Sequence, residues 1–125
     1  MKKVLLSIFY ASLFFNVAAV AEEKKLTSEE AQALFSNKTF DGVNETKGKS
    51  FQVFSSADGV HNLKKANGKM KAGAWRVDNR GRHCVDFGSK EKCSKVMDMG
   101  DGVYHKISYG EHTHTLKNFV DGDQL

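Results

Sequence analysis

The sequence predicts a mainly β fold, a small antiparallel β-barrel of seven to eight strands with one short N-terminal helix. Turn signals rich in Gly, Asn and Asp recur about every 8–14 residues through the second half of the chain, a spacing typical of sandwiches and barrels. So many short strands in so short a chain favour a closed or nearly closed barrel. The chain contains no proline to protect exposed sheet edges, and closure would remove those edges.

The first 21 residues have the pattern of a secretory signal peptide. Lys2 and Lys3 give a positive start, residues 4–20 carry no charge, and Ala19-Val20-Ala21 is a small-x-small cleavage pattern. A membrane-spanning helix needs about 20 apolar residues, whereas this run is interrupted by Ser and Asn. We therefore expect residues 1–21 to be removed and residues 22–125 to form one periplasmic or secreted domain, with no membrane span after cleavage.

The charge balance of the mature chain argues against nucleic acid as a partner. Removing Lys2 and Lys3 with the signal peptide leaves 17 Lys and Arg against 15 Asp and Glu, a net charge of +2. These charges are interspersed along the chain rather than gathered in blocks. A nucleic-acid-binding domain of this size normally carries a stronger basic patch.

A short helix is predicted at the start of the mature domain. Thr27 and Glu30 have the spacing of a capping box, and Leu26 can pack against Ala31 as a hydrophobic staple. Leu34 shares a face with Ala31, and the helix is expected to end near residue 36. A helix this short is marginal alone and needs a larger body to pack on.

That body is predicted from short runs of β-formers separated by turn signals. The expected strands cover residues 40–43, 51–54, 60–63, 70–77, 83–87, 93–97, 103–109 and 112–120.

Cys84 and Cys93 are predicted to form a structural disulfide, because an exported chain with two cysteines usually pairs them. If Gly88-Ser89 is a two-residue turn, the hairpin register places Cys84 opposite Cys93 at a non-hydrogen-bonded position, with Cα atoms about 4.5 Å apart. The alternative, a reactive redox pair, lacks the Cys-x-x-Cys spacing that lowers a thiol pKa.

The middle of the chain resembles a family of small exported bacterial proteins of unknown function. The resemblance lies in Gly73-Ala74-Trp75-Arg76-Val77, the turn residue Gly81, Cys84-Val85 and Cys93. It implies a lipocalin-like small barrel and no activity. Lipocalins also use a Gly-x-Trp motif, in which the Trp closes one end of the barrel, and we expect Trp75 to be a core residue.

The histidines near the C-terminus are the one cluster with metal-ligand chemistry. If residues 103–109 and 112–118 form a hairpin with an even-length loop, His105, His112 and His114 share one face of the sheet. Three imidazoles on one face could hold Zn²⁺ or Cu²⁺. An odd-length loop would separate His105 from the other two. The alternative interpretation is that His112 and His114 lie on a solvent-exposed strand face, or form hydrogen bonds within the barrel, and bind no metal.

No catalytic motif was recognised in the sequence. The leading hypothesis is an exported, non-enzymatic binding protein for a small ligand or an envelope protein, with no resident cofactor. The alternatives are a periplasmic metal-binding protein that uses the histidine face and an uncharacterised small enzyme.

Overall fold

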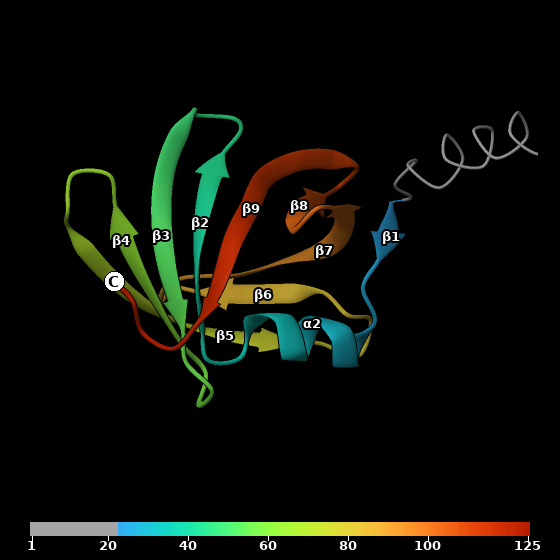
Figure 1. The fold of residues 1–125 in the computed structure, drawn as a ribbon, viewed down its shortest axis with the longest axis horizontal. Helices are drawn as coiled ribbons and strands as arrows, with labels where there is room; N and C mark the ends of the chain where they lie inside the picture. The colour runs from blue at the N-terminus through green and yellow to red at the C-terminus, as the bar shows by residue number, and fades with distance from the viewer. Residues whose placement is uncertain (1–22) are drawn as a thin grey trace, which may run out of the picture.

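The structure, a computed structural model, describes residues 23–125, and the predicted signal peptide lies outside them. Eight strands form a closed antiparallel barrel in which each strand pairs with the next and β9 pairs with β2 (Figure 1). The predicted fold class is confirmed. The strands are β2 (Lys38–Asn44), β3 (Lys49–Ser55), β4 (Val60–Lys65), β5 (Met70–Val77), β6 (His83–Asp86), β7 (Glu91–Gly100), β8 (Val103–Ser108) and β9 (Glu111–Asp121).

A ninth strand, β1 (Lys24–Lys25), was not predicted from the sequence. It pairs with β7 at Met97 and Asp98, beyond the last pairing of β6 with β7 at His83. The segment therefore covers the edge of β7 that the shorter β6 leaves free. Two consecutive lysines have no strand signal of their own, so this pairing depends on the neighbouring edge.

The predicted helix is α2 (Ser28–Phe35), and its capping box is present. The Thr27 hydroxyl accepts a hydrogen bond from the Glu30 N–H (3.1 Å), and the Glu30 carboxylate accepts one from the Thr27 N–H (2.9 Å). The Ser28 hydroxyl donates to the carbonyl of Asp78 in the β5–β6 turn (2.8 Å). Gly81 of the same turn has φ +80°, and a Cβ there would lie 2.5 Å from the Leu26 carbonyl oxygen. A larger residue at Gly81 would therefore push the helix start away from the barrel.

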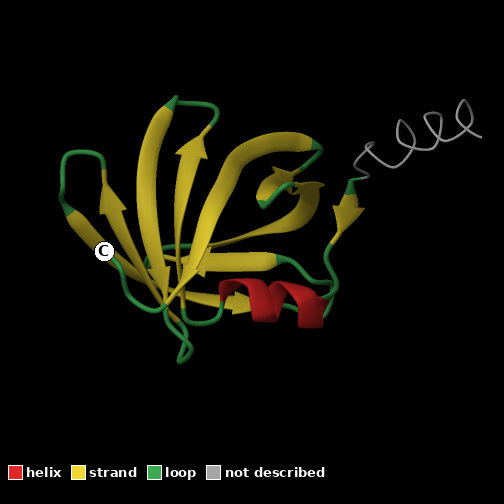
Figure 2. Cartoon of the chain, in the orientation of Figure 1, coloured by secondary structure: helices red, strands yellow, loops and turns green. Residues whose placement is uncertain are grey.

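The helix lies across one end of the barrel (Figure 2). Its Phe35 side chain belongs to the buried core and closes that end. The Phe35 side chain is fully buried and contacts Phe40, Phe119 and Trp75, with ring centroids 5.6, 5.8 and 6.2 Å away. Trp75 is 5% exposed, as expected of a core residue, and its indole N–H donates to the Ser56 carbonyl (2.8 Å). We call this buried end the plugged half of the barrel.

Alternation along the strands assigns every second side chain to the barrel interior. Those near the helix are buried, as Val53, Val96 and Leu116 show. Those farther along the same strands are only partly buried, and we call the region that they line the open half. Its inward-facing residues are Phe51, Leu63, Val85, Lys106, Ser108 and His114. The barrel is therefore closed by the helix at one end and accessible to solvent from the other.

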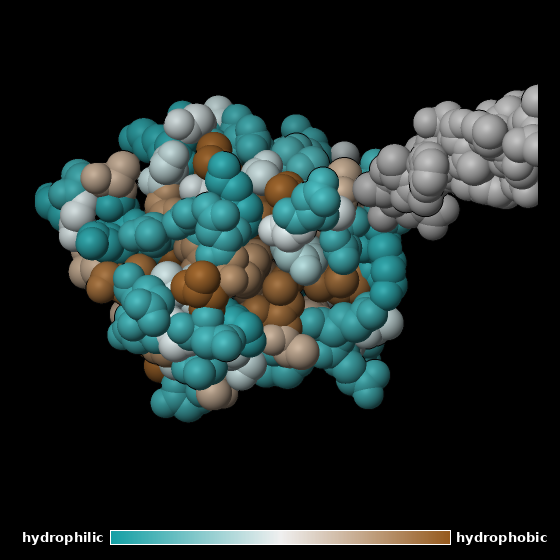
Figure 3. Space-filling view, in the orientation of Figure 1, coloured by the Kyte–Doolittle hydropathy of each residue, from teal (hydrophilic) through white to brown (hydrophobic). Residues whose placement is uncertain are grey.

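The face shown in Figure 3 is mostly hydrophilic, with one band of apolar residues where β9 passes above α2. None of the helices within residues 23–125 is both long enough and apolar enough to cross a membrane.

Replacing Phe35 with Ala should lower the free energy of unfolding by about 3–5 kcal/mol, because it leaves a cavity among three aromatic rings. Chemical denaturation with two spectroscopic probes measures this loss. Gln32→Ala, at an exposed position on the same helix, is the matched control and should change stability by less than about 0.5 kcal/mol. Equal effects of the two substitutions would show that the helix does not plug the barrel.

Candidate functional site

Lys106 is the most unusual residue of the barrel interior. It lies on β8 opposite Val96 of β7 and His114 of β9, and both of these side chains face inward. Surrounding protein lowers the pKa of the Lys106 amine to about 8. None of the ion pairs within residues 23–125 involves this amine. The Lys106 side chain is partly buried, and desolvating an ammonium is costly unless it is paired, so Lys106 lacks the partner that such a group normally has.

Three histidines lie close enough to Lys106 for its charge to act on them. Burial, followed by the Lys106 charge, lowers the pKa of His61 to about 3 and that of His114 to about 4. The same two causes, with smaller contributions from His61 and His114, hold the pKa of His83 well below its ordinary value. All three imidazoles are therefore neutral at pH 7, and each offers one N–H donor and one acceptor nitrogen.

The polar atoms of this group are largely without partners. His83 is 1% exposed and stacks on Phe35 (centroids 3.9 Å apart), yet neither ring nitrogen has a hydrogen-bond partner among the described residues. The Nδ1 atom of His61 has no partner among the described residues either. The His61 residue is 5% exposed, and its ring centroid lies 6.0 Å from that of His83. Most buried polar atoms in proteins are paired, so unpaired ones need a specific explanation.

Further polar and aromatic groups extend from these histidines into the open half. The hydroxyls of Ser94 and Ser108 lie 2.7 Å apart and bond to each other. The Phe51 ring contacts His114 edge-on (centroids 6.0 Å apart), and Phe87 contacts His61 in the same way (5.5 Å). The interior thus combines unpaired polar groups with aromatic surface, the mixture found in small-molecule sites.

The predicted face of three histidines is wrong. The loop at Tyr109-Gly110 has two residues, an even length as the prediction required, and Ile107 pairs with His112. A bulge then shifts the register, so that His114 pairs with Lys106 and His105 pairs with Thr115. The extra residue moves His114 to the inner face, because one residue reverses the side of a strand. His105 and His112 remain on the outer face, with their rings stacked 3.7 Å apart.

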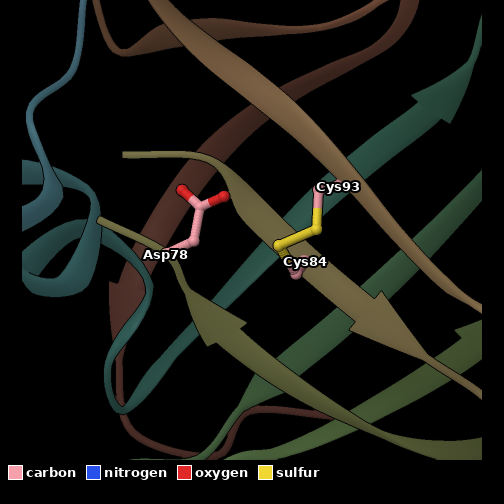
Figure 4. A group of neighbouring side chains, drawn as sticks. All are labelled: Asp78, Cys84 and Cys93. Atoms are coloured by element: carbon pink, nitrogen blue, oxygen red, sulfur yellow. A yellow bond between two sulfur atoms is a disulfide. The ribbon is translucent and has the colours of Figure 1, made fainter. Parts of the chain in front are cut away.

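The predicted disulfide is present, with the Cys84 and Cys93 sulfur atoms 2.05 Å apart. The predicted register is confirmed, and the Cα atoms are 3.9 Å apart, closer than the expected 4.5 Å. Figure 4 shows the Asp78 carboxylate beside the bridge. That carboxylate accepts hydrogen bonds from the backbone N–H groups of Arg80 and Arg82 and from the Arg82 guanidinium. Both sulfurs and the carboxylate are therefore engaged, and this cluster stabilises the hairpin and the neighbouring turn.

A groove with a volume of about 380 Å³ runs along β2, β3 and the end of β4, and Lys117 of β9 also lines it. Its one carboxylate is already paired, unlike the Lys106 ammonium inside the barrel. The Asp41 carboxylate accepts hydrogen bonds from the amides of Gln52 (3.0 Å) and Asn118 (2.8 Å). The interior is therefore the stronger candidate site.

Sequence reasoning singled out His105, His112 and His114, but did not connect His61, His83 and Lys106. These three residues lie on separate strands, 22 or more positions apart in the chain. Alternation was an available signal for His61 and His83, which have the same parity as the inward Leu63 and Val85 of their strands. It gave no such signal for Lys106, because the apolar Ile107 of β8 has the opposite parity and faces outward. Strand registers across the closed barrel were needed to bring the three together.

Comparisons with known proteins found no match. No family model fits the chain, and no curated protein or solved structure is significantly similar to it. The resemblance carried by the Gly-x-Trp-x-Val and cysteine pattern therefore stays a prediction, and the site must be interpreted from its own chemistry.

The neutral histidines predict acid sensitivity of the fold. Below about pH 6.5 the unfolded chain binds protons that buried His61 and His83 do not, so the free energy of unfolding falls as the pH drops. His83→Phe should remove one such proton and reduce the slope near pH 5 by about 1.4 kcal/mol per pH unit. It should also raise stability at pH 7 by about 1–3 kcal/mol, because two unpaired nitrogens are replaced by carbon.

Urea denaturation between pH 4.5 and 8 measures both effects. His112→Phe adds a ring at an exposed position and is the matched control, with a change of less than about 0.5 kcal/mol expected at pH 7. A His83→Phe variant with an unchanged slope would contradict a neutral, unpaired His83.

Proposed function

We propose that this protein is an exported, non-enzymatic binding protein that takes a small ligand into the open half of its barrel. The observation that carries the proposal is the set of unpaired polar groups in the interior, at Lys106, His83 and His61. Unpaired buried groups lower stability, and proteins retain such costs mainly at functional sites. A ligand that supplied the missing partners would recover this free energy on binding.

The partial exposure of the open half supports entry of a ligand from the end away from α2. Inward-facing side chains cannot be reached through a hydrogen-bonded barrel wall. The accessible surface that Phe51, Leu63 and Lys106 retain must therefore be reached through the barrel interior. Phe87, which contacts His61, is 37% exposed and so connects this group to solvent.

The geometry favours binding over catalysis. A catalytic histidine is usually oriented by a hydrogen bond to a carboxylate or a carbonyl. His83 has no such bond among residues 23–125, and its ring is positioned by stacking on Phe35. The disulfide between Cys84 and Cys93 supports an oxidising compartment, as expected for an exported chain.

The metal-binding alternative now depends on fewer residues. His105 and His112 remain neighbours on the outer face, but His114 lies on the opposite side of the sheet. Two imidazoles are fewer than the ligands of a typical protein Zn²⁺ site. Zn²⁺ or Cu²⁺ bound there would have to take its remaining ligands from elsewhere, so we rank this alternative second. A protein partner at the rim of the barrel, the other form of the binding hypothesis, has no comparable observation behind it.

Native mass spectrometry of the untagged mature protein, recovered from the exported fraction of its own cells, tests the proposal. We expect a protein that begins at Glu22 and retains one organic molecule. Leu63→Trp should abolish this retention, because an indole in the open half fills the space that the ligand needs. Ala72→Trp is the matched control, since it adds the same indole at an exposed outward position of the neighbouring strand, and it should retain the ligand.

Two outcomes would contradict the proposal. A metal mass that is lost on chelation and depends on His105 and His112 would favour the metal-binding alternative. A bare protein that also fails to bind any small apolar or amphipathic probe would show that the barrel takes no ligand.

A further inference from the structure

We infer that the ligand of the open half is an organic anion, whose charged group lies against the Lys106 ammonium while its apolar part lies along Phe51 and Leu63. This inference rests on the proposed binding function and names the chemical class of the ligand. It starts from the arrangement of charge inside the barrel.

Among residues 23–125, Lys106 has no counter-ion. The pKa of about 8 leaves about nine in ten molecules charged at pH 7. Burial alone accounts for the direction of the shift, and none of the carboxylates within residues 23–125 offsets it. A bound anion would pair with this ammonium through a charge-assisted hydrogen bond, the strongest kind available to it.

The neutral histidines complement an anion rather than a cation. His61 and His83 face the same interior and can each turn an N–H toward an acceptor. An anionic oxygen accepts hydrogen bonds only, so it can use these N–H groups together with the ammonium. A cation would be repelled by Lys106, whose charge already suppresses protonation of the three histidines.

The charge at the entrance of the open half is positive, like that of Lys106. The strand registers place four exposed lysines on the inner face, beside residues of the open half: Lys49, Lys65, Lys71 and Lys92. The Lys71 ammonium lies 4.4 Å from the centre of the Phe87 ring, at the entrance to the interior. Two acids take inner-face positions: Glu111, at the tip of the β8–β9 hairpin opposite Ser108, and Asp98, which lies away from the entrance where β7 pairs with β1. A concave site lined by one sign of charge attracts ligands of the opposite sign.

The rest of the open half is apolar enough for a hydrocarbon body. Phe51, Leu63 and Val85 face inward and are only partly buried, and Phe87 extends this surface to the entrance. An inorganic anion would leave these side chains exposed to water. An organic anion covers them and pairs with Lys106 in the same pose, so both parts of the site are used.

Two fluorescent probes with the same ring skeleton distinguish the contribution of the charged contact at Lys106 from that of the apolar surface. 1-Anilinonaphthalene-8-sulfonate carries the anionic group, and N-phenyl-1-naphthylamine has the same rings without it. We expect the sulfonate to bind the intact mature protein with one-to-one stoichiometry and at least about tenfold more tightly than the uncharged probe. Decanoate or decyl phosphate should displace it, with the better competitor identifying the preferred headgroup, whereas decanol should compete at least about tenfold more weakly.

Lys106→Met tests the charged contact. It should weaken sulfonate binding by about tenfold or more while leaving the uncharged probe within about threefold, because the methionine keeps the apolar volume. Lys95→Met changes the net charge equally at an outward, exposed position of β7, and should leave both affinities unchanged. Lys106→Met removes an unpaired, partly buried charge and should fold. Lys106→Arg, which keeps the charge, should retain most of the preference and provides a second variant.

The possible outcomes distinguish failure of the anion preference from failure of the proposed binding function. Equal binding of both probes to the parent and to Lys106→Met would overturn the anion preference and leave a binding protein for neutral ligands. Failure of both probes to bind one-to-one would overturn the proposed function itself. A loss of sulfonate binding as large in Lys95→Met as in Lys106→Met would assign the preference to net charge and reject the site.

Discussion

Eight strands hydrogen-bonded in a closed cycle leave this protein a single interior, and side-chain alternation assigns every second residue to it. An inward polar side chain cannot reach solvent through such a wall. It must find a partner inside, be reached from one end of the barrel, or stay unpaired. Phe35 of α2 closes one end with a cluster of aromatic rings, so solvation comes from the other end alone. The division of the barrel into a plugged half and an open half follows from this constraint.

The boundary between the two halves is where stability and function conflict. His83 packs against Phe35 as an aromatic ring would, but its two nitrogens lie in surroundings that offer them no bond. Lys106, two strands along the barrel from His83, is close enough for its charge to act on that ring, and it forms no ion pair within residues 23–125. A barrel selected for stability alone would fill these positions with apolar side chains, as many small barrels do. The polar residues are explained more simply as groups that are completed when a ligand enters.

Two bulges in β9 determine which of its residues take part. The first lies in the pairing with β2, where β9 has one residue more than β2 between the Thr39–Val120 and Asp41–Lys117 pairs. It turns Phe119 inward to stack on Phe40 (centroids 4.6 Å apart). The other lies near Thr113 and turns His114 inward beside Lys106. Each bulge adds one residue to one strand, and one residue reverses a side chain. The plug gains a ring from the first bulge, and the candidate site gains an imidazole from the second.

The local chemistry of the sequence determined much of the fold. The capping box at Thr27, the turn residues and the alternating strands acted over a few residues each, so helix and strand positions were predictable within a few residues. The Cys84–Cys93 bridge was predictable for the same reason, since one short hairpin sets its register. Barrel closure, the pairing of β1 with β7 and the bulge that moved His114 depended on contacts between distant segments. The group around Lys106 belongs with these, because His61, His83 and Lys106 come from three strands that meet only when the sheet closes. Alternation in the sequence can place each of them on one face of its own strand, but only the tertiary structure decides which residues share the interior and which lack a partner there.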